Sequence, residues 1–226
     1  MNDCPIALNG NTLICLPSGA LWWPGQKLLC VSDLHLGKSD RVARRGGTHL
    51  PPYDTRDTLD RLTQALDVHN PKHVICLGDS FDDLDAALNL SVADRNQIAR
   101  MQAGRRWIWI EGNHDPGPID LGGTHVSELS IEGLTFRHIA QPHARGEISG
   151  HYHPKAHIKT RAKTITRACF LCDASRLIMP AFGTFTGGLS TQDPVFQTLM
   201  GRDAQAILTG QKALAFPMPR AAIHPV

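Results

Sequence analysis

The sequence predicts an α/β domain with a parallel sheet at its centre. Two short apolar runs, 27–32 and 73–77, have the length of buried strands. Between them Leu59, Leu62 and Leu66 recur at helical spacing. A strand, a helix and a second strand in this order form a crossover unit, which implies parallel pairing of the two strands.

Further elements of the first half follow from turn and capping signals. The turn Pro17-Ser18-Gly19 between 12–16 and 20–23 predicts a hairpin before the first strand of the crossover. Segment 39–52, rich in Arg and Gly, is expected to be irregular, and Asp54 or Thr55 is placed to cap the helix that Pro71 ends. A second helix over 92–103, stopped by Gly104, and a third strand over 106–110 complete this half.

The second half of the chain has little helical periodicity and reads as strands. Residues 125–131 and 134–139, around the turn Glu132-Gly133, predict a hairpin with His138 near its far end. A short strand that ends in two histidines is expected within 147–154, and further strands at 156–162, 167–172 and 177–182, before the glycine-rich segment 183–189.

Length and composition are typical of one globular domain covering residues 1–226. The chain has 226 residues, of which 42% are hydrophobic and 19% charged, so it can bury one substantial core. A net charge of +2 neither indicates nor opposes a polyanionic partner. No apolar run approaches the roughly 18 residues that span a bilayer, and no basic segment precedes an apolar one at the start. We therefore expect a cytoplasmic protein without a membrane partner.

The six cysteines are scattered along the chain and are expected to be reduced. Cys30 and Cys76 lie within apolar strand-like runs, where a thiol behaves as a small hydrophobe. Cys169 and Cys172 have a spacing found in zinc sites, but no second Cys or His pair accompanies them at a matching interval. A structural zinc ion is not expected there.

Polar clusters follow the strands at the points where each strand ends. Asp33 and His35 follow the first strand, and on an extended backbone side chains two residues apart point the same way. Because the carboxyl ends of parallel strands share one sheet edge, Asp79 and Asn113 should meet them there. The clusters together supply Asp33, His35, Asp79, Asn113, His138, His151 and His153.

These seven side chains exceed the needs of one metal ion but suit two. Two ions bridged by one carboxylate can clamp both the attacking and the leaving oxygen in phosphoryl displacement. Oxygen donors mixed with imidazole favour Mn, Fe or Zn over Ca. The expected cofactor is therefore two divalent ions, with Mn preferred and Fe or Zn as alternatives.

The order of these clusters resembles the motifs of the calcineurin-like metallophosphoesterase superfamily. The matching motifs are Asp33-x-His35, Gly78-Asp79, Gly112-Asn113-His114-Asp115, a later His and Gly150-His151-x-His153. Within the superfamily, segments 50–54 and 180–189 are similar to those of the bacterial ligase-associated DNA damage response endonucleases. The resemblance implies a sandwich of two mixed β-sheets flanked by helices, in four layers of the order αββα.

The resemblance also implies a role for each motif residue. Asp33, His35 and His153 would hold one metal, Asn113, His138 and His151 the other, and Asp79 would bridge them. His114 would protonate the leaving oxygen or steady the transition-state charge, with Asp115 orienting it.

Two histidines compete for the fourth motif. The superfamily usually has His-Gly at this point, whereas this chain has His138-Ile139. His143 is the alternative, but it follows Pro142 in an expected loop, while His138 ends an alternating strand. We therefore prefer His138 as the ligand.

Basic residues gather after the first and the last motif. Lys38 and Arg41 belong to the first group, which His49 follows, and Lys155 begins the second. We expect Lys38, Arg41 and His49 to bind substrate, and both groups would suit the phosphates of a nucleic-acid strand. A solvated surface is the alternative. No aromatic residues alternate with the basic ones, as they do in many single-strand-binding segments.

The expected function is hydrolysis of phosphodiester bonds, as a DNA endonuclease or phosphodiesterase in bacterial DNA repair. By resemblance, DNA ligase or helicase repair proteins are the expected protein partners. The alternatives are a phosphodiesterase or phosphomonoesterase acting on small molecules, and a non-catalytic scaffold that has lost its metals. The complete ligand set and His114 argue against the scaffold.

Overall fold

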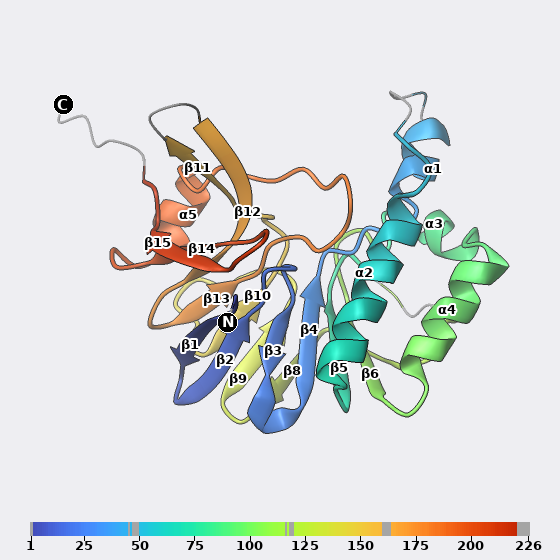
Figure 1. The fold of residues 1–226 in the computed structure, drawn as a ribbon, viewed down its shortest axis with the longest axis horizontal. Coiled ribbons are helices and arrows are strands. Elements are labelled where there is room, and N and C mark those ends of the chain that lie inside the picture. The colour runs from blue at the N-terminus through green and yellow to red at the C-terminus, as the bar shows by residue number, and fades with distance from the viewer. Residues whose placement is uncertain are drawn as a thin grey trace.

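The computed structural model describes residues 2–44, 46, 50–115, 117, 120–159 and 164–220, with the side chain of Lys159 left undescribed. Within these ranges the chain forms two facing sheets with helices on their outer sides (Figure 1). Predicted His49 falls outside the described residues.

The first sheet has the order β1-β2-β3-β4-β5-β6-β7. Its strands β4, β5 and β6 run parallel, as the crossover pattern predicted. Strand β7 also pairs parallel with β6, and β1 to β4 pair antiparallel. The register sets Ser32 beside Leu77 and Leu77 beside Ile110, so the carboxyl ends of β4, β5 and β6 are level. The strand bounds are β1 (Cys4–Leu8), β2 (Asn11–Cys15), β3 (Leu21–Trp23), β4 (Leu28–Ser32), β5 (His73–Leu77), β6 (Arg106–Ile110) and β7 (Thr124–Val126).

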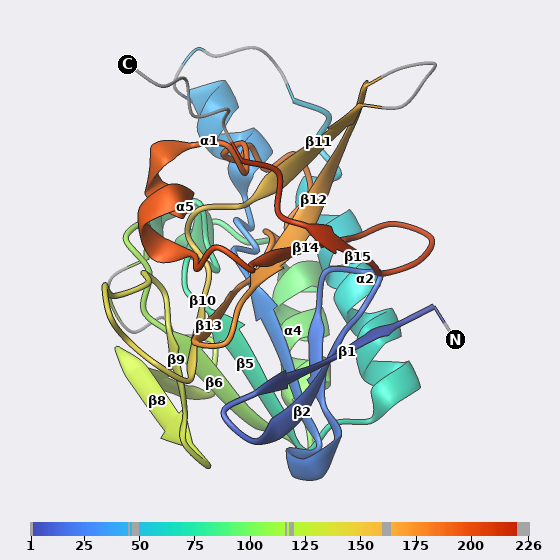
Figure 2. The same ribbon diagram turned by 90° about the vertical axis from the view of Figure 1, so that its left-hand side faces the viewer.

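The second sheet has the order β15-β14-β12-β13-β10-β9-β8, and β11 pairs with β12. Its strands β9, β10 and β13 are parallel neighbours, and the β11–β12 hairpin extends beyond the sheet (Figure 2). The bounds are β8 (Glu128–Ile131), β9 (Leu134–Arg137), β10 (Glu147–Ser149), β11 (Lys155–Lys159), β12 (Thr164–Cys172), β13 (Arg176–Ile178), β14 (Gln205–Leu208) and β15 (Leu214–Pro217).

Three apolar clusters separate the four layers. The central cluster, which includes Ile75 and Phe136, lies between the sheets. A second, which includes Leu62 and Val74, packs helices on the first sheet, and a third, around Phe196, lies on the outer side of the second sheet. The helices are α1 (Lys38–Arg44), α2 (Asp54–His69), α3 (Leu84–Leu88), α4 (Val92–Gln102) and α5 (Pro194–Leu199), with a short 3₁₀ turn at Pro24–Gln26. The predicted αββα sandwich is confirmed.

The predictions for individual segments were less accurate than the prediction of the overall architecture. Segment 39–52, expected to be irregular, begins with α1. Helix α2 starts where predicted, but Tyr53 is its N-cap and no side chain caps it. Asp54 instead accepts hydrogen bonds from Ser39, and Thr55 accepts one from the backbone N–H of Gly37. These contacts fasten α2 to the loop that follows the first motif.

The segment expected as one strand over 125–131 divides between the sheets. Strand β7 belongs to the first sheet and β8 to the second, so the chain changes sheets at Ser127. Alternation of apolar and polar residues breaks at this point, because the consecutive polar residues Ser127 and Glu128 stand between Val126 and Leu129.

The cysteines of the described chain are free, and most are buried. Cys169 and Cys172 lie in β12 and belong to different apolar clusters. Side chains three residues apart on a strand point to opposite faces, so these two thiols cannot share one ion. Among the described helices, none is long and apolar enough to cross a membrane.

Candidate metal centre

Three candidate ligands meet at the carboxyl end of β4. His153 Nε2 lies 3.1 Å from Asp33 Oδ1 and 3.4 Å from His35 Nε2. Asp33 and His35 are buried, and His153 is partly exposed. One oxygen and two imidazole nitrogens therefore converge on a common point, and they belong to the residues that the family resemblance assigned to the first metal.

A second group of candidate ligands lies beside the first. His138 Nε2 is 3.2 Å from Asp79 Oδ2, 3.0 Å from Asn113 Oδ1 and 3.2 Å from His151 Nδ1. His138 is buried in this cluster, whereas His143 is exposed and lies in a separate cleft with Pro142. Of the two competing histidines, the structure places His138 among the other motif residues.

The two groups are joined by short contacts. The backbone N–H of His151 donates to both carboxylate oxygens of Asp33, at 3.2 and 3.0 Å. The two sheets approach so closely here that a side chain at Gly150 would collide with Ser32 and Asp33. Each group contains a carboxylate and two imidazoles whose nitrogens face one another, a donor set that suits Mn, Fe or Zn. The residues present fit a pair of divalent cations.

The backbone at the candidate ligands is unusual. Asp33, His35, Asp79, His151 and His153 all have positive φ angles, between 43° and 71°. Residues other than glycine adopt this left-handed region infrequently, and such strain gathers at functional sites. The extended backbone assumed for Asp33 and His35 is therefore wrong, although their side chains do converge.

Burial and neighbouring polar groups determine the ionisation of the Asp and His side chains in the two groups. Burial alone would raise the pKa values of Asp33 and Asp79, but hydrogen bonds and the nearby imidazoles lower both below the usual value. Burial, together with the charge of His138, lowers the pKa of His151. Ionised carboxylates and a neutral imidazole are the protonation states that metal binding requires.

Asp82 is a residue of the site that the motif reasoning did not single out. One of its carboxylate oxygens lies 3.0 Å from His35 Nδ1, and the other accepts a hydrogen bond from Arg41. Burial opposes ionisation, but these partners lower the pKa of Asp82 to about 2. A carboxylate on the far nitrogen of a ligating histidine fixes the ring orientation and raises ligand basicity. The sequence signal that could have identified Asp82 is its position, three residues after Asp79 in the same loop.

His114 points toward the second group from its edge. Its Nδ1 lies 2.8 Å from the carbonyl oxygen of Asp82, and its Nε2 lies 4.0 Å from Asp79 Oδ2. Because a carbonyl can only accept, Nδ1 carries a proton and Nε2 faces the cluster. The side chain is 36% exposed, so the ring remains accessible from solvent.

The prediction that Asp115 orients His114 is corrected by the structure. The Asp115 carboxylate accepts hydrogen bonds from the backbone N–H groups of Ser80, Phe81 and Gly112. Burial and the charge of Asp79 raise its pKa to about 7 despite these bonds. Asp115 therefore ties the loops after β5 and β6 together, and the Asp82 carbonyl is the group that contacts the His114 ring.

Comparison with known proteins agrees with this geometry. Residues 26–169 match the family model described as calcineurin-like phosphoesterase. The chain belongs to this family. A search of curated proteins finds no match. Among solved structures, the chain is similar to the crystal structure of Pseudomonas putida nuclease MPE, with 29% sequence identity, a TM-score of 0.73, and coverage of 93% of this chain and 98% of that chain.

As a calcineurin-like phosphoesterase, the protein is a metal-dependent hydrolase of phosphoester bonds. The family match covers the strands that carry Asp33, His35, Asp79, Asn113, His138 and the His151-His153 turn. These residues converge at the shared carboxyl edge of the two sheets, the upper edge in Figure 1, which is the candidate phosphoesterase site.

Of the two clefts described next, only the first is lined by candidate ligands. One, of about 380 Å³, is lined by Asn113 and His138 together with Glu111, Glu128 and Arg137. Another, of about 360 Å³, lies beside the loop 183–189 and includes Lys155. The predicted substrate residues Lys38 and Arg41 lie on α1 and pair with Asp82, so their charges are already partly compensated.

Proposed function

We propose that the protein is a dimetal phosphodiesterase that cleaves DNA. The observation that carries the proposal is the pair of adjoining ligand groups, one around Asp33, His35 and His153 and one around Asp79, His138 and His151. Asp79 belongs to the second group, 3.2 Å from His138 Nε2, and the nearby imidazole of His35 in the first group also helps to lower its pKa. We assign it as the carboxylate shared by both ions.

Manganese is the proposed metal, with iron and zinc as alternatives that the donor set also accommodates. When bound, such ions polarise the phosphoryl oxygens and supply a nucleophile near neutral pH. The ligands themselves are held in place by other groups. Asp82 orients His35, and Ser32 donates a 2.5 Å hydrogen bond to Asp33.

His114 is the proposed general acid for the leaving oxygen. Its Nδ1–H is held by the Asp82 carbonyl, which leaves Nε2 directed at the opening of the site. A proton held at Nε2 can pass to an alkoxide leaving group, which is poorly stable without one. Lys38 and Arg41, held on α1 near His35 by Asp82, are proposed to contact the substrate phosphate.

DNA is the proposed substrate because a solved structure similar over most of the chain is that of a nuclease. We extend this to a role in bacterial DNA repair in the cytoplasm, with DNA ligase or helicase repair proteins as partners.

The test is hydrolysis by the manganese-loaded protein of single-stranded DNA, duplex DNA, bis-p-nitrophenyl phosphate and p-nitrophenyl phosphate. We expect cleavage of DNA and of the diester, and loss of both after exhaustive chelation. Hydrolysis restricted to the small substrates would instead support a small-molecule phosphoesterase. Full activity after chelation would contradict the dimetal mechanism.

A further inference from the structure

Arg61 on α2 contacts a segment that lies beside the first group of candidate ligands. Its Nη2 donates hydrogen bonds to the carbonyl of Phe182 at 2.6 Å and to Thr184 Oγ1 at 2.9 Å. The guanidinium also lies over the Phe182 ring, 4.7 Å from its centroid. We call residues 182–184 the covering segment. Arg61 therefore joins helix α2 to the covering segment.

The covering segment lies directly on the backbone of the first motif. The backbone N–H of Phe182 donates to the carbonyl of Ser32 at 2.8 Å, and that of Gly183 donates to the carbonyl of Asp33 at 3.1 Å. A Cβ at Gly183 would lie 2.2 Å from the carbonyl oxygen of Leu34, so a larger residue there would force the two segments apart. Phe182 thus accepts a hydrogen bond from Arg61 through its carbonyl and holds Ser32 through its N–H.

The backbone that the covering segment holds is strained. Asp33 has a φ of 52°, in the left-handed region that residues other than glycine adopt infrequently. Such a conformation persists when the surrounding structure over-determines it. The backbone N–H of Asp33 donates to the carbonyl of Gly78 across 3.3 Å, which is long for a hydrogen bond. The shorter contacts from Phe182 and Gly183 add to this restraint through the carbonyls of Ser32 and Asp33.

Arg61 is itself held in a network with Asp57. Its Nε donates to Asp57 Oδ2 at 3.1 Å, and Thr184 Oγ1 donates to the same oxygen at 2.5 Å. The hydrogen bond from Thr184 and, to a lesser degree, the one from Arg61 lower the pKa of Asp57, although burial opposes them. The backbone N–H of Thr184 donates to Thr58 Oγ1 at 3.0 Å. One planar guanidinium therefore links α2 to both ends of the covering segment, and the single ammonium of a lysine has no such fork of donors.

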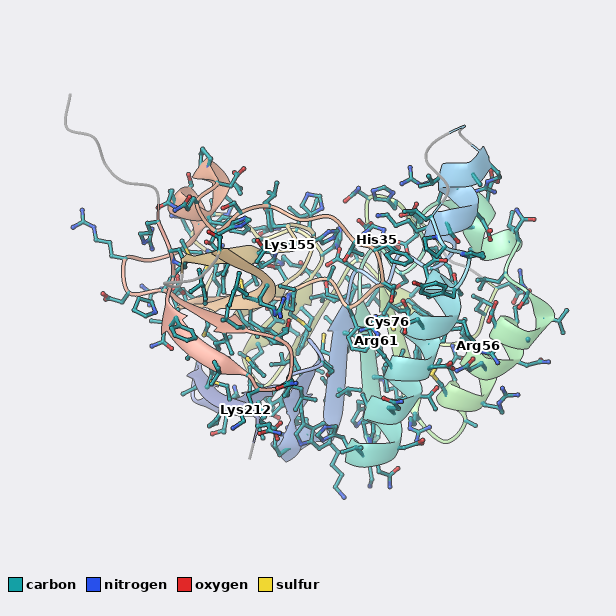
Figure 3. All side chains as sticks on the ribbon, turned by 45° about the horizontal axis from the view of Figure 1, so that its top comes forward. His35, Arg56, Arg61, Cys76, Lys155 and Lys212 are labelled. Atoms are coloured by element: carbon teal, nitrogen blue, oxygen red, sulfur yellow. The ribbon has the colours of Figure 1, made fainter. Side chains whose placement is uncertain are left out.

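Arg56 offers a matched comparison on the same helix. Both arginines pair with an aspartate four residues away, Arg56 with Asp60 at 3.7 Å and Arg61 with Asp57 at 3.1 Å. Arg56 also lies 3.8 Å from Asp94 on α4, and the two arginines lie on different sides of α2 (Figure 3). The Arg56 pairs are confined to the helical layer, and exposed pairs of this kind contribute little to stability. Contact with the covering segment is what distinguishes Arg61.

We propose that Arg61 is a positioning residue for the first metal. By holding Phe182 and Thr184, Arg61 keeps the covering segment on Ser32 and Asp33, and this fixes the Asp33 carboxylate where the ion binds. Arg61 acts through the backbone and not by contact with the ion or the substrate. Because this role requires a bound ion, it rests on the dimetal function proposed above.

The test titrates the metal-free, full-length chain with manganese in a calorimeter. Arg61→Met keeps a long apolar side chain but removes the donors, and it should bind one of the two ions about 10-fold more weakly, the lower end of the effect of losing a group that orients a ligand. Arg61→Lys should show the same loss, because charge without the planar fork does not restore the link. Arg56→Met should bind both ions as the wild type does.

Turnover at saturating manganese separates positioning from catalysis. Hydrolysis of bis-p-nitrophenyl phosphate by Arg61→Met should return to the wild-type rate once the ion is saturating, because Arg61 contacts no substrate in this role. Thr184→Val is a second variant that removes the link to Asp57 while preserving the shape of the side chain. It should weaken binding of the same ion, and it provides the test if Arg61→Met does not fold.

Wild-type manganese affinity in the folded Arg61 and Thr184 variants would overturn the proposal, even if the Tm of the metal-free variants fell, because the role would then be confined to stability. An equal loss of affinity in Arg56→Met, or a loss of turnover that persists at saturating manganese, would also overturn it. A wild-type chain that does not bind two ions contradicts the proposed function itself. A wild-type chain that binds two ions, with the same affinities in the variants, retains the proposed function and loses only this inference.

Discussion

The Nδ1 atom of His35 lies 3.0 Å from a carboxylate oxygen of Asp82, at the bottom of the first group of candidate ligands. Asp82 is fully buried, and Arg41 and Lys38 approach the same carboxylate from α1. The contact with His35 sets which ring nitrogen faces the metal, because Nδ1 is occupied and Nε2 is left as the ligand atom. His35 and α1 are therefore held by one carboxylate.

Asp82→Asn should weaken metal binding by about 10- to 100-fold, the usual effect of removing such a carboxylate. The cause is loss of the negative charge that makes His35 a better ligand, with the shape of the side chain preserved. Isothermal titration of the metal-free protein with manganese measures the effect. Asp85→Asn, at an exposed position of α3, is the control and should bind as the wild type does. Equal affinities in the wild type and Asp82→Asn would refute the orienting role.

His114→Ala should leave the metal content unchanged and lower turnover on DNA by about 100-fold or more, the usual share of general acid catalysis. The loss should be far smaller for bis-p-nitrophenyl phosphate, because p-nitrophenolate departs without a proton. Metal analysis and turnover rates on both substrates provide the measurement. His143→Ala is the control, since His143 is exposed and lies in a different cleft. An equal loss on both substrates would show that His114 stabilises charge instead, and loss of one ion would show that it is a ligand.

Asp79→Asn should reduce the bound metal from two ions per chain toward none. Asp79 is the proposed shared ligand, and its carboxylate lies 3.2 Å from His138 Nε2. Removing its charge leaves the adjoining cations without the anion that screens their repulsion. Elemental analysis of the dialysed protein gives the stoichiometry, and Asp67→Asn on the exposed side of α2 is the control. Two ions retained at full occupancy in Asp79→Asn would exclude it as the bridge.

Gly78→Ala should destabilise the protein and damage the second metal site. A Cβ at Gly78 would lie 2.2 Å from the His138 ring, and the φ of Gly78 is +69°. Left-handed alanine costs about 1 kcal/mol, and overpacking adds roughly 1 to 3 kcal/mol. The total corresponds to a fall in Tm of about 4 to 16 °C for a domain of this size.

Gly104→Ala separates the two causes, because Gly104 has a φ of +73° but no atom within 4 Å of its added Cβ. Gly104→Ala should lose only the stability that the left-handed backbone conformation costs alanine. Its Tm should therefore fall by about 2 to 4 °C, and its metal content should not change. Equal behaviour of the two variants would show that contact with His138 plays no part.

The sequence alone determined the order of the elements that carry the candidate ligands. Apolar runs before Asp33, Asp79 and Asn113 are short enough to be strands, and parallel pairing brings their carboxyl ends to one edge. This argument needs no side-chain detail, because strand polarity and the helix between strands restrict the topology. The motifs therefore identified residues that the structure brings together in the two candidate ligand groups.

Only the tertiary structure decided how the site residues are held and which charges are free. Asp82 was not singled out and Asp115 was expected to orient His114, but Asp82 contacts His35 and Asp115 binds backbone amides. Their roles depend on contacts between loops that follow different strands, and such contacts leave no local pattern in sequence. The same is true of Phe185 and Tyr53, whose rings meet only because the loop 183–189 is fastened beside the start of α2.

The basic residues around the site show most clearly the difference between what the sequence determines and what the tertiary structure determines. In the sequence, the basic residues after the first motif and those after the last look alike. In the folded chain Arg41 is paired with Asp82, whereas Lys155 has no carboxylate in ion-pair range among the described residues. The sequence gives the charge of each residue, but the electrostatic effect of that charge depends on the groups nearest to it. The fold determines which groups those are.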